Sequence, residues 1–389
     1  LLYAGTDGRA PSPEALRRDG IPGAALTLAG AALGPLLFRA IRLANPFFLG
    51  PLFMAALLSS LDLPAFDVPG PLLAAAQIVL GTWLGGAFRR ELLGGPLAHP
   101  FQPLMDPRLR EFSLTEGLSD AEARWGTRPS GIWAPECAYA PGMEKGYAAA
   151  GVTHFMVDGP ALRGDTTLAR PVYDSDVLAF GRDLKVSYRV WSPKSGYPGH
   201  AAYRDFHTYD HATGLKHARV TGRAVASQDK APYDPEAASA AIDKHVVDFV
   251  DSVRRRLREE SSRIGRPALV VAAFDTELFG HWWFEGPIWL ERVLRALPEA
   301  GIDVGTLADA RSRGYVGAPV ELERSSWGSG KDWRVWAGDA VQDLVALNEE
   351  VVDTALRTVD AGRGAASNGR PELRNPVNDQ ILRETLLAI

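Results

Sequence analysis

One stretch of the chain, residues 267–286, constrains the fold more than any other. Its apolar run, residues 268–274, has the length and the β-branched content of a strand that is buried on both faces. The run ends abruptly at Asp275, and a polar and aromatic set follows closely: Glu277, His281, Trp282, Trp283 and Glu285. Because parallel α/β folds place their chemistry at the carboxyl ends of strands, this stretch predicts a buried parallel strand with a functional loop behind it.

The side chains of this loop suit a carbohydrate ligand. Indole rings such as those of Trp282 and Trp283 stack on the C–H faces of a sugar, while carboxylates and His281 form hydrogen bonds with its hydroxyls. Ionisable groups that are costly to bury gather at functional sites. We therefore prefer a sugar-binding loop over the plainer alternative, which is a polar loop that only caps a strand.

The size and charge of the chain narrow the classes of partner. Its 389 residues exceed one typical domain and can bury a large core. The net charge of -5, without a basic tract, gives no indication of a nucleic-acid partner. The single cysteine, Cys137, excludes an internal disulfide and fits a reducing compartment, so we expect a cytoplasmic protein.

Residues 1–94 differ from the rest of the chain. Three apolar stretches, residues 24–38, 47–61 and 72–88, are rich in Ala, Leu and Gly. Helices packed in lipid have this composition, although a helix that spans a bilayer needs roughly 17 to 25 residues. Two interpretations stay open: membrane association through residues 24–88, or buried helices of a soluble domain. Because few β-branched residues occur here, we expect two or three apolar helices and no barrel strands.

This segment resembles the small-residue-rich repeats of AbrB-type membrane proteins. The resemblance rests on residues 48–59, FLGPLFMAALLS, and on residues 73–85, LAAAQIVLGTWLG, and it extends over about residues 23–90. These residues contain no catalytic motif. Any chemistry is therefore expected in the part of the chain that follows.

From residue 95 onward, predicted helices and strands alternate. A helix at 107–125, a strand from Ser130, a helix at 141–150 and a strand at 152–158 indicate a parallel sheet or barrel. Residues 159–235 contain many turn residues, so we expect an insertion over the active face. The elements expected after it are helices at 237–262, 287–297, 340–359 and 376–389, a strand at 302–305 and a linker at 362–369.

Two carboxylates stand out in this part. Glu136 and Asp275 each follow a short apolar strand, and each has an aromatic neighbour, Trp133 and Phe274 respectively. Glycoside chemistry needs such a pair, and in retaining enzymes one carboxylate is the nucleophile while the other carries the proton. A solvated surface charge is the ordinary explanation for any single Asp or Glu. Two of them at strand ends within aromatic loops favour a glycoside-processing site.

Three motifs connect this hypothesis with a family. Residues 133–139 (WAPECAY), 273–283 (AFDTELFGHWW) and 325–333 (SSWGSGKDW) resemble motifs of glycoside hydrolase family 57, and most closely those of its 1,4-α-glucan branching enzymes. The resemblance implies an α/β fold, an incomplete (β/α)7 barrel over residues 95–320. The start of a helical domain, residues 321–389, follows the barrel, and the apolar segment 1–94 precedes it.

The same resemblance implies roles for individual residues. Glu136 matches the family's nucleophile and Asp275 its general acid/base, in a retaining reaction that cleaves an α-1,4 link and forms an α-1,6 link. An α-glucan is thus the expected partner, and the oligomeric state is left open. The expected glucan contacts are Arg182, Gly199 and Trp327 by motif match, and Trp282, Trp283 and His281 from the loop chemistry.

The chain also departs from the family pattern. The family begins with a strand that carries a histidine motif, and nothing in this sequence matches it. Two alternatives therefore stay open: an α-glucan hydrolase of the same family, and a non-catalytic protein that binds glucan or is tethered to a membrane. Neither a cofactor nor a metal is expected, because residues 328–331 lack the Walker spacing, and the pair His207 and His211 lacks the glutamate of a zinc protease.

Overall fold

The computed structural model describes residues 94–192, 195–222, 224–365 and 375–388, together with the single positions 29, 33, 36, 37 and 54. The chain divides into two units, Leu1–Arg89 and Arg90–Ile389, and the sheet and its helices belong to the second. Apart from those single positions, the helices predicted within residues 24–88 lie outside the described residues. No helix in the described part is both long and apolar enough to cross a membrane.

A four-stranded sheet in the order β1-β2-β4-β3 organises the second unit. The strands β1 (Gly131–Ile132), β2 (His154–Asp158) and β4 (Leu178–Arg182) run parallel, whereas β3 (Arg170–Pro171) pairs antiparallel with β4. Gly94 adds a parallel bridge to Ile132 in β1. The α/β class is thus confirmed, and the strands of the described residues form an open sheet, not a closed barrel.

The two longest strands of the sheet are buried along their whole length, as expected for strands covered on both faces. Gly181 lets β4 approach its neighbours closely, because a Cβ at this position would lie 2.7 Å from side-chain atoms of Leu162 and Thr166. Both strands end in a charged residue, Asp158 in β2 and Arg182 in β4, and these two residues are register partners. Their side chains therefore emerge together at the carboxyl end of the sheet.

β4 and the helix α6 (Leu184–Val190) were not predicted from the sequence, and both lie in the turn-rich residues 159–235. That stretch is therefore not a simple insertion, since β4 lies between β2 and β3. Conversely, the strands predicted at residues 268–274 and 302–305 are not formed. Residues 268–274 run beside the end of β4, where the Asp183 N–H donates to Val271 O at 2.8 Å. Ala272 is exposed, so this run is not buried on both faces.

The long helices carry the end signals that their sequences predict. α4 (Pro107–Trp125) starts after Asp106, whose side chain accepts from the Arg108 N–H, and it ends at Gly126 with a φ of 71°. α7 (Pro235–Ile264) starts after Asp234 in the same way. The other helices are α5 (Met143–Ala149), α8 (Gly286–Glu299), α9 (Leu307–Ser312), α10 (Arg334–Ala337), α11 (Gln342–Ala365) and α12 (Pro376–Ala388).

Short 3-10 turns connect these elements. In the described residues they are η2 (Gln102–Leu104), η3 (Pro135–Cys137), η4 (Gly159–Leu162), η5 (Tyr197–Gly199), η6 (Ser227–Asp229), η7 (Thr276–Leu278), η8 (Ser329–Lys331) and η9 (Asp339–Val341). The linker predicted at 362–369 is partly wrong, because α11 continues through Ala365. Residues 366–369 lie outside the described part.

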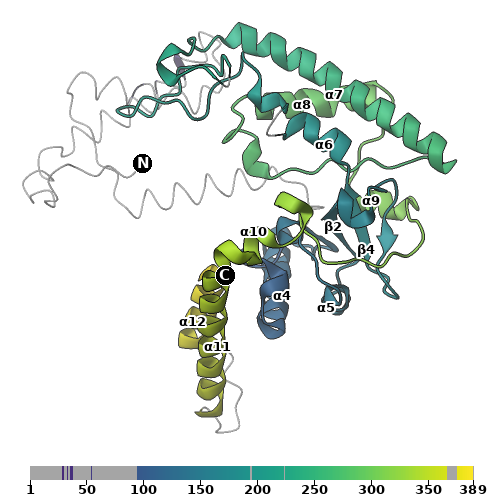
Figure 1. Ribbon diagram of the computed structural model, residues 1–389, viewed down its shortest axis with the longest axis vertical. Helices are drawn as coiled ribbons and strands as arrows, with labels where there is room; N and C mark the ends of the chain where they lie inside the picture. The colour runs from purple at the N-terminus through teal and green to yellow at the C-terminus, as the bar shows by residue number, and fades with distance from the viewer. Residues whose placement is uncertain are drawn as a thin grey trace, which may run out of the picture. The chain divides into compact units, whose positions relative to one another are not determined.

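Two large apolar clusters stabilise this unit. The first, which we call the helical core, lies between α6, α7 and α8, which pack together in Figure 1, and it contains the fully buried Trp283 and Trp289. The second lies between the sheet and the helices α4 and α5, with the rings of Tyr139 and Phe155 stacked 5.6 Å apart. The carboxyl ends of the strands are thus supported by well-packed elements.

Candidate active site

Glu136 lies just after β1, in the turn η3. Its φ of 59° and the φ of 49° at Cys137 place two consecutive residues in the left-handed region, which residues other than glycine rarely adopt. A later segment holds this turn: the Trp327 N–H donates to Glu136 O at 2.9 Å, and Tyr139 and Ser325 exchange backbone hydrogen bonds of 3.0 and 3.1 Å. Because such backbone strain gathers at functional sites, the turn marks Glu136 as a candidate catalytic residue.

An indole holds the carboxylate of Glu136. Trp327 Nε1–H donates to Glu136 Oε2 at 2.6 Å, and a hydrogen bond to a charged acceptor of this kind is strong and directional. The ring of Trp133 meets the ring of Trp327 edge-on, with the ring centroids 5.5 Å apart. Both indoles are half-buried, so the carboxylate is oriented beside an aromatic wall.

Three charged side chains form a cluster, and two of them contact Trp327 directly. Arg182 Nε donates to Asp158 Oδ1 at 2.9 Å, and Lys331 Nζ lies 2.7 Å from Asp158 Oδ2. The guanidinium carbon of Arg182 is 4.8 Å from the centroid of the Trp327 ring, and Lys331 Nζ donates to Trp327 O at 2.9 Å. The structure thus brings the predicted residues Arg182 and Trp327 together beside Glu136, and it adds Asp158 and Lys331, which the sequence analysis missed.

Asp275 immediately precedes the turn η7. Desolvation by the surrounding protein raises the pKa of its carboxyl, although the residue keeps an exposed face, and the negative charges of Glu136 and Glu277 raise that pKa further. The positive charges of His99 and Arg182 act in the opposite direction. The charge of Glu136 thus acts on Asp275, which supports the expectation that the two carboxyls share one candidate site. A raised pKa suits a carboxyl that must carry a proton as a general acid.

The remaining candidate contacts differ in their surroundings. Trp282 Nε1–H donates to Glu277 Oε1 at 2.9 Å, and the exposed ring of His281 meets the Trp282 ring edge-on. Trp283 is only 1% exposed and packs in the helical core, so its ring offers no face to a sugar and this expectation is corrected. Gly199 lies in η5, where its N–H donates to Gly196 O at 3.1 Å. A glucan contact at Gly199 stays a prediction.

His99 is another residue of this site that the sequence analysis missed. It lies on the loop that follows Gly94, the residue bridged to β1, and its charge lowers the pKa of Asp275. The available signal was its place in the proline-rich residues 96–103. Nothing in that loop pointed to Asp275, because the two residues are far apart in the sequence.

Two further kinds of group in the chain bear on its reactivity, the lone thiol and the side chains that can bind a metal. Burial raises the pKa of the Cys137 thiol, which favours its protonated form and a packing role. Within the described ranges, no three His, Cys, Asp or Glu side chains are arranged to hold a metal ion. Glu136 and Asp275 therefore stay the candidate reactive groups of this site.

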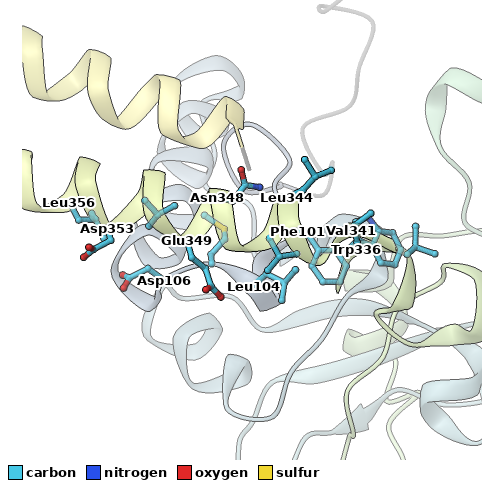
Figure 2. A pocket seen from close by; sticks show the side chains of 14 residues that line it. Phe101, Leu104, Asp106, Trp336, Val341, Leu344, Asn348, Glu349, Asp353 and Leu356 are labelled. Carbon is cyan, nitrogen blue, oxygen red and sulfur yellow. The ribbon is translucent and has the colours of Figure 1, made fainter. Parts of the chain in front are cut away.

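A separate cavity of about 530 Å³ lies between the loop at residues 101–106 and the helices α10 and α11 (Figure 2). Most of its lining is apolar, and the rings of Phe101 and Trp336 stack at 4.5 Å. Figure 2 shows the carboxylates of Asp106, Glu349 and Asp353 away from these two rings. None of its lining residues belongs to the carboxylate site, so the cavity and the candidate chemistry are separate features.

The fold and the site together define a class: an α/β protein with two coupled carboxyls in an indole-lined site at the carboxyl end of a parallel sheet. The model of glycosyl hydrolase family 57 matches residues 84–315, more than half of the sequence, and the chain belongs to this family. The predicted family is thereby confirmed; the motifs at residues 133–139 and 273–283 lie within the match, and the motif at 325–333 lies beyond it.

Relatives with assigned names add detail. A probable 1,4-alpha-glucan branching enzyme of Mycobacterium tuberculosis is 73% identical over 300 residues, which are 77% of this chain and 57% of the relative. The chain thus matches little more than half the length of that relative. A branching enzyme of this family from Pyrococcus horikoshii has a similar structure, with a TM-score of 0.72 and 26% identity over 96% of this chain and 71% of the other. The alpha-amylase AmyC of Thermotoga maritima has a TM-score of 0.66 and 25% identity, over 94% of this chain and 71% of the other.

A second family model, that of the transition state regulatory protein AbrB, matches residues 2–102. The predicted resemblance of residues 23–90 to AbrB therefore has support. The description of that family is a regulatory protein, however, so the expected resemblance to a membrane protein was wrong.

Proposed function

We propose that this chain is the catalytic part of a retaining 1,4-α-glucan branching enzyme, with Glu136 as nucleophile and Asp275 as general acid/base. One observation carries the proposal: Trp327 fixes the Glu136 carboxylate, and the charge of that carboxylate helps to raise the pKa of Asp275. Retaining glycosidases divide the work of two neighbouring carboxyls in this way, into an oriented nucleophile and a proton carrier. The named relatives support an α-glucan as the substrate.

The reaction takes place in two displacements. Glu136 attacks the anomeric carbon of an α-1,4-linked glucan while Asp275 protonates the departing glycosidic oxygen, which leaves a covalent glycosyl–enzyme. Asp275, now ionised, takes the proton from the 6-hydroxyl of an acceptor glucan as the oxygen of that hydroxyl displaces Glu136. The product is an α-1,6 branch, and both carboxyls return to their starting states.

Transfer to a sugar hydroxyl requires that water be kept away from the glycosyl–enzyme. The half-buried indoles of Trp133 and Trp327 flank Glu136. Trp282 donates to Glu277 on the loop that carries Asp275. The rings beside Glu136, and an indole on the loop of Asp275, support transfer as the outcome in preference to hydrolysis.

Incubation with amylose tests the proposal. We expect new α-1,6 linkages from the unaltered protein, detected by the NMR signals of the anomeric protons and by sensitivity to a debranching enzyme. The variant Glu136→Gln should form none while it unfolds at the same denaturant concentration. A protein that forms neither α-1,6 linkages nor new reducing ends contradicts the proposal and leaves a glucan-binding role.

An α-glucan hydrolase is the second candidate, because the likeness to the alpha-amylase AmyC, with a TM-score of 0.66, is close to that of the branching enzyme. New reducing ends without α-1,6 linkages in the same incubation would favour the hydrolase. The two activities differ only in the acceptor that reaches the glycosyl–enzyme, so one assay separates them.

Finer features belong to the same proposal. They are an incomplete (β/α)7 barrel over residues 95–320, the start of a helical domain at 321–389 and a cytoplasmic location. The expected substrate contacts of Arg182, Gly199, Trp327, Trp282 and His281 belong to it as well. Membrane association through residues 24–88 is a separate proposal, and co-flotation of the protein with liposomes tests it.

A further inference from the structure

A buried cluster of charges is connected to the candidate nucleophile through Trp327. The carboxylate of Asp158 is 1% exposed, and it contacts two cations at once, Arg182 Nε at 2.9 Å and Lys331 Nζ at 2.7 Å. Burying such groups carries a desolvation penalty that their mutual attraction often only balances, so a buried ion pair is weak evidence for stability. An alternative reason for its presence is that it fixes geometry.

Both cations contact the same indole residue. The Arg182 guanidinium carbon lies 4.8 Å from the Trp327 ring centroid, within the range of a cation–π interaction. Lys331 Nζ donates to the backbone oxygen of Trp327 at 2.9 Å. Trp327 is thus held at its ring from β4 and at its backbone from η8, and Asp158 on β2 holds both cations.

Trp327 in turn contacts Glu136 at two points. Its backbone N–H donates to Glu136 O at 2.9 Å, and its indole N–H donates to Glu136 Oε2 at 2.6 Å. The first bond closes the strained left-handed turn, and the second orients the carboxylate. A chain of contacts therefore leads from Asp158 through its two cations and Trp327 to Glu136.

We propose that Asp158 is a positioning residue for the nucleophile: it holds Arg182 and Lys331 so that Trp327 keeps its indole N–H on the Glu136 carboxylate. This proposal rests on the proposed role of Glu136. It also changes the role expected for Arg182, which is only 7% exposed and has its Nε committed to Asp158. Arg182 orients the indole, and direct contact with glucan is not required of it.

The indole proton of Trp327 reports on this arrangement without any need for activity. The chain has ten tryptophans, and a two-dimensional NMR spectrum of the protein labelled on its indole nitrogens resolves them, with Trp327→Phe identifying the signal of Trp327. A strong hydrogen bond to a carboxylate moves this proton downfield. We expect Asp158→Asn to move the Trp327 signal upfield by more than any other indole signal.

Kinetics give the second readout. We expect Asp158→Asn to lower kcat about 10- to 100-fold with KM changed by less than about twofold, because misplacing a reacting group by about 1 Å can lower a rate about 100-fold. Lys331→Met should act in the same direction, and Lys331→Arg, which keeps the cation, should restore most of the signal position and of kcat. Because Lys331 is partly exposed, this pair also tests the proposal if Asp158→Asn fails to fold.

Asp205→Asn is the matched control. Asp205 is another buried aspartate that pairs with a lysine, Lys230, and it contacts neither Trp327 nor Glu136. An unmoved Trp327 signal in both Asp158→Asn and Lys331→Met, or an equal movement in Asp205→Asn, overturns the positioning role. If the unaltered protein does not act on glucan, the proposed function fails while the Trp327 signal still decides the role of Asp158.

Discussion

Two tryptophan-rich regions of this molecule look alike in sequence and differ in structure. In the carboxylate site, Trp327 is half-buried and its indole N–H meets Glu136 at 2.6 Å. In the helical core, Trp283 and Trp289 are fully buried, and neither indole nitrogen has a hydrogen-bond partner among the described residues. The Trp327 indole thus contacts the candidate nucleophile, whereas the indoles of Trp283 and Trp289 contribute to the packing of the helical core.

Loss of the proton carrier should give the largest effect. Asp275→Asn is expected to lower the rate of glucan turnover by about 100- to 10,000-fold, the range of general acid–base groups, and to keep or raise the melting temperature. The fold raises the pKa of Asp275, so it disfavours the ionised form, and Asn removes that penalty near neutral pH. The gain in melting temperature should fade as the pH falls through the raised pKa of Asp275, and it should be absent below the ordinary carboxyl range, where Asp275 is neutral in both states.

Calorimetry across the pH range measures this gain, and glucan assays measure the rate. If Asp275→Asn lowers the melting temperature as well as the activity, Asp275 belongs among the residues that stabilise the fold.

Truncation in the helical core should act in the opposite way. Trp283→Ala is expected to lower the free energy of unfolding by about 3–5 kcal/mol, as for other large buried aromatic residues. Denaturant titration followed by circular dichroism measures the change. A loss below about 1 kcal/mol, together with a rise in KM for glucan, would move Trp283 from the core to the substrate site.

Substitution of the tryptophan in the carboxylate site should have a smaller effect than the changes at Asp275 and Trp283. Trp327→Phe keeps an aromatic ring and removes the indole N–H, which donates to a carboxylate. Such hydrogen bonds contribute about 1.5–3 kcal/mol, so we expect kcat to fall roughly 10- to 100-fold. Stopped assays on amylose and the same denaturant titration are the measurements. If the indole bond matters only for folding, the free energy of unfolding will fall while kcat per folded molecule stays the same.

The smallest effects should be shifts of the pH profile. Glu277→Gln removes a charge that raises the pKa of Asp275, so the alkaline limb of the rate profile should move to lower pH. His99→Ala removes a charge that lowers this pKa, so the same limb should move to higher pH. Rate measurements over a range of buffers test both signs, with Trp289→Phe in the helical core as the control that shifts neither. If the alkaline limb moves in the same direction in Glu277→Gln and in His99→Ala, the assignment of Asp275 is contradicted.

The candidate site residues that could be predicted from the sequence share one property: the residues next to them in the chain give the signal. Glu136 and Asp275 each follow an extended segment and carry aromatic neighbours, and Trp327 lies in a loop rich in indoles. Asp158 lacked such a signal, because it becomes a partner of Arg182 only through the register of β2 with β4. β4 itself was hidden among turn residues, so this pairing could not be predicted.

The contrast between Trp282 and Trp283 shows a second limit. The two are adjacent, and their composition favours a sugar platform equally. Only the packing of α7 and α8 decides that the Trp283 ring turns inward while Trp282 reaches Glu277. Tertiary contacts of this kind override local patterns, and this is also why the apolar run at residues 268–274 lies beside β4 without being a regular strand.

The turn that carries Glu136 is closed by a residue made much later in synthesis. Trp327 lies 191 positions further along the chain, and at about 5–20 residues per second a ribosome needs about 10 to 40 seconds to cover that span. Between the synthesis of Asp275 and that of Trp327, the growing polypeptide contains both carboxyls but not the indole that orients Glu136. A product cut or terminated between Asp275 and Ser325 would keep both acids without the indole that orients Glu136, so we expect it to process glucan much more slowly than the longer chain does.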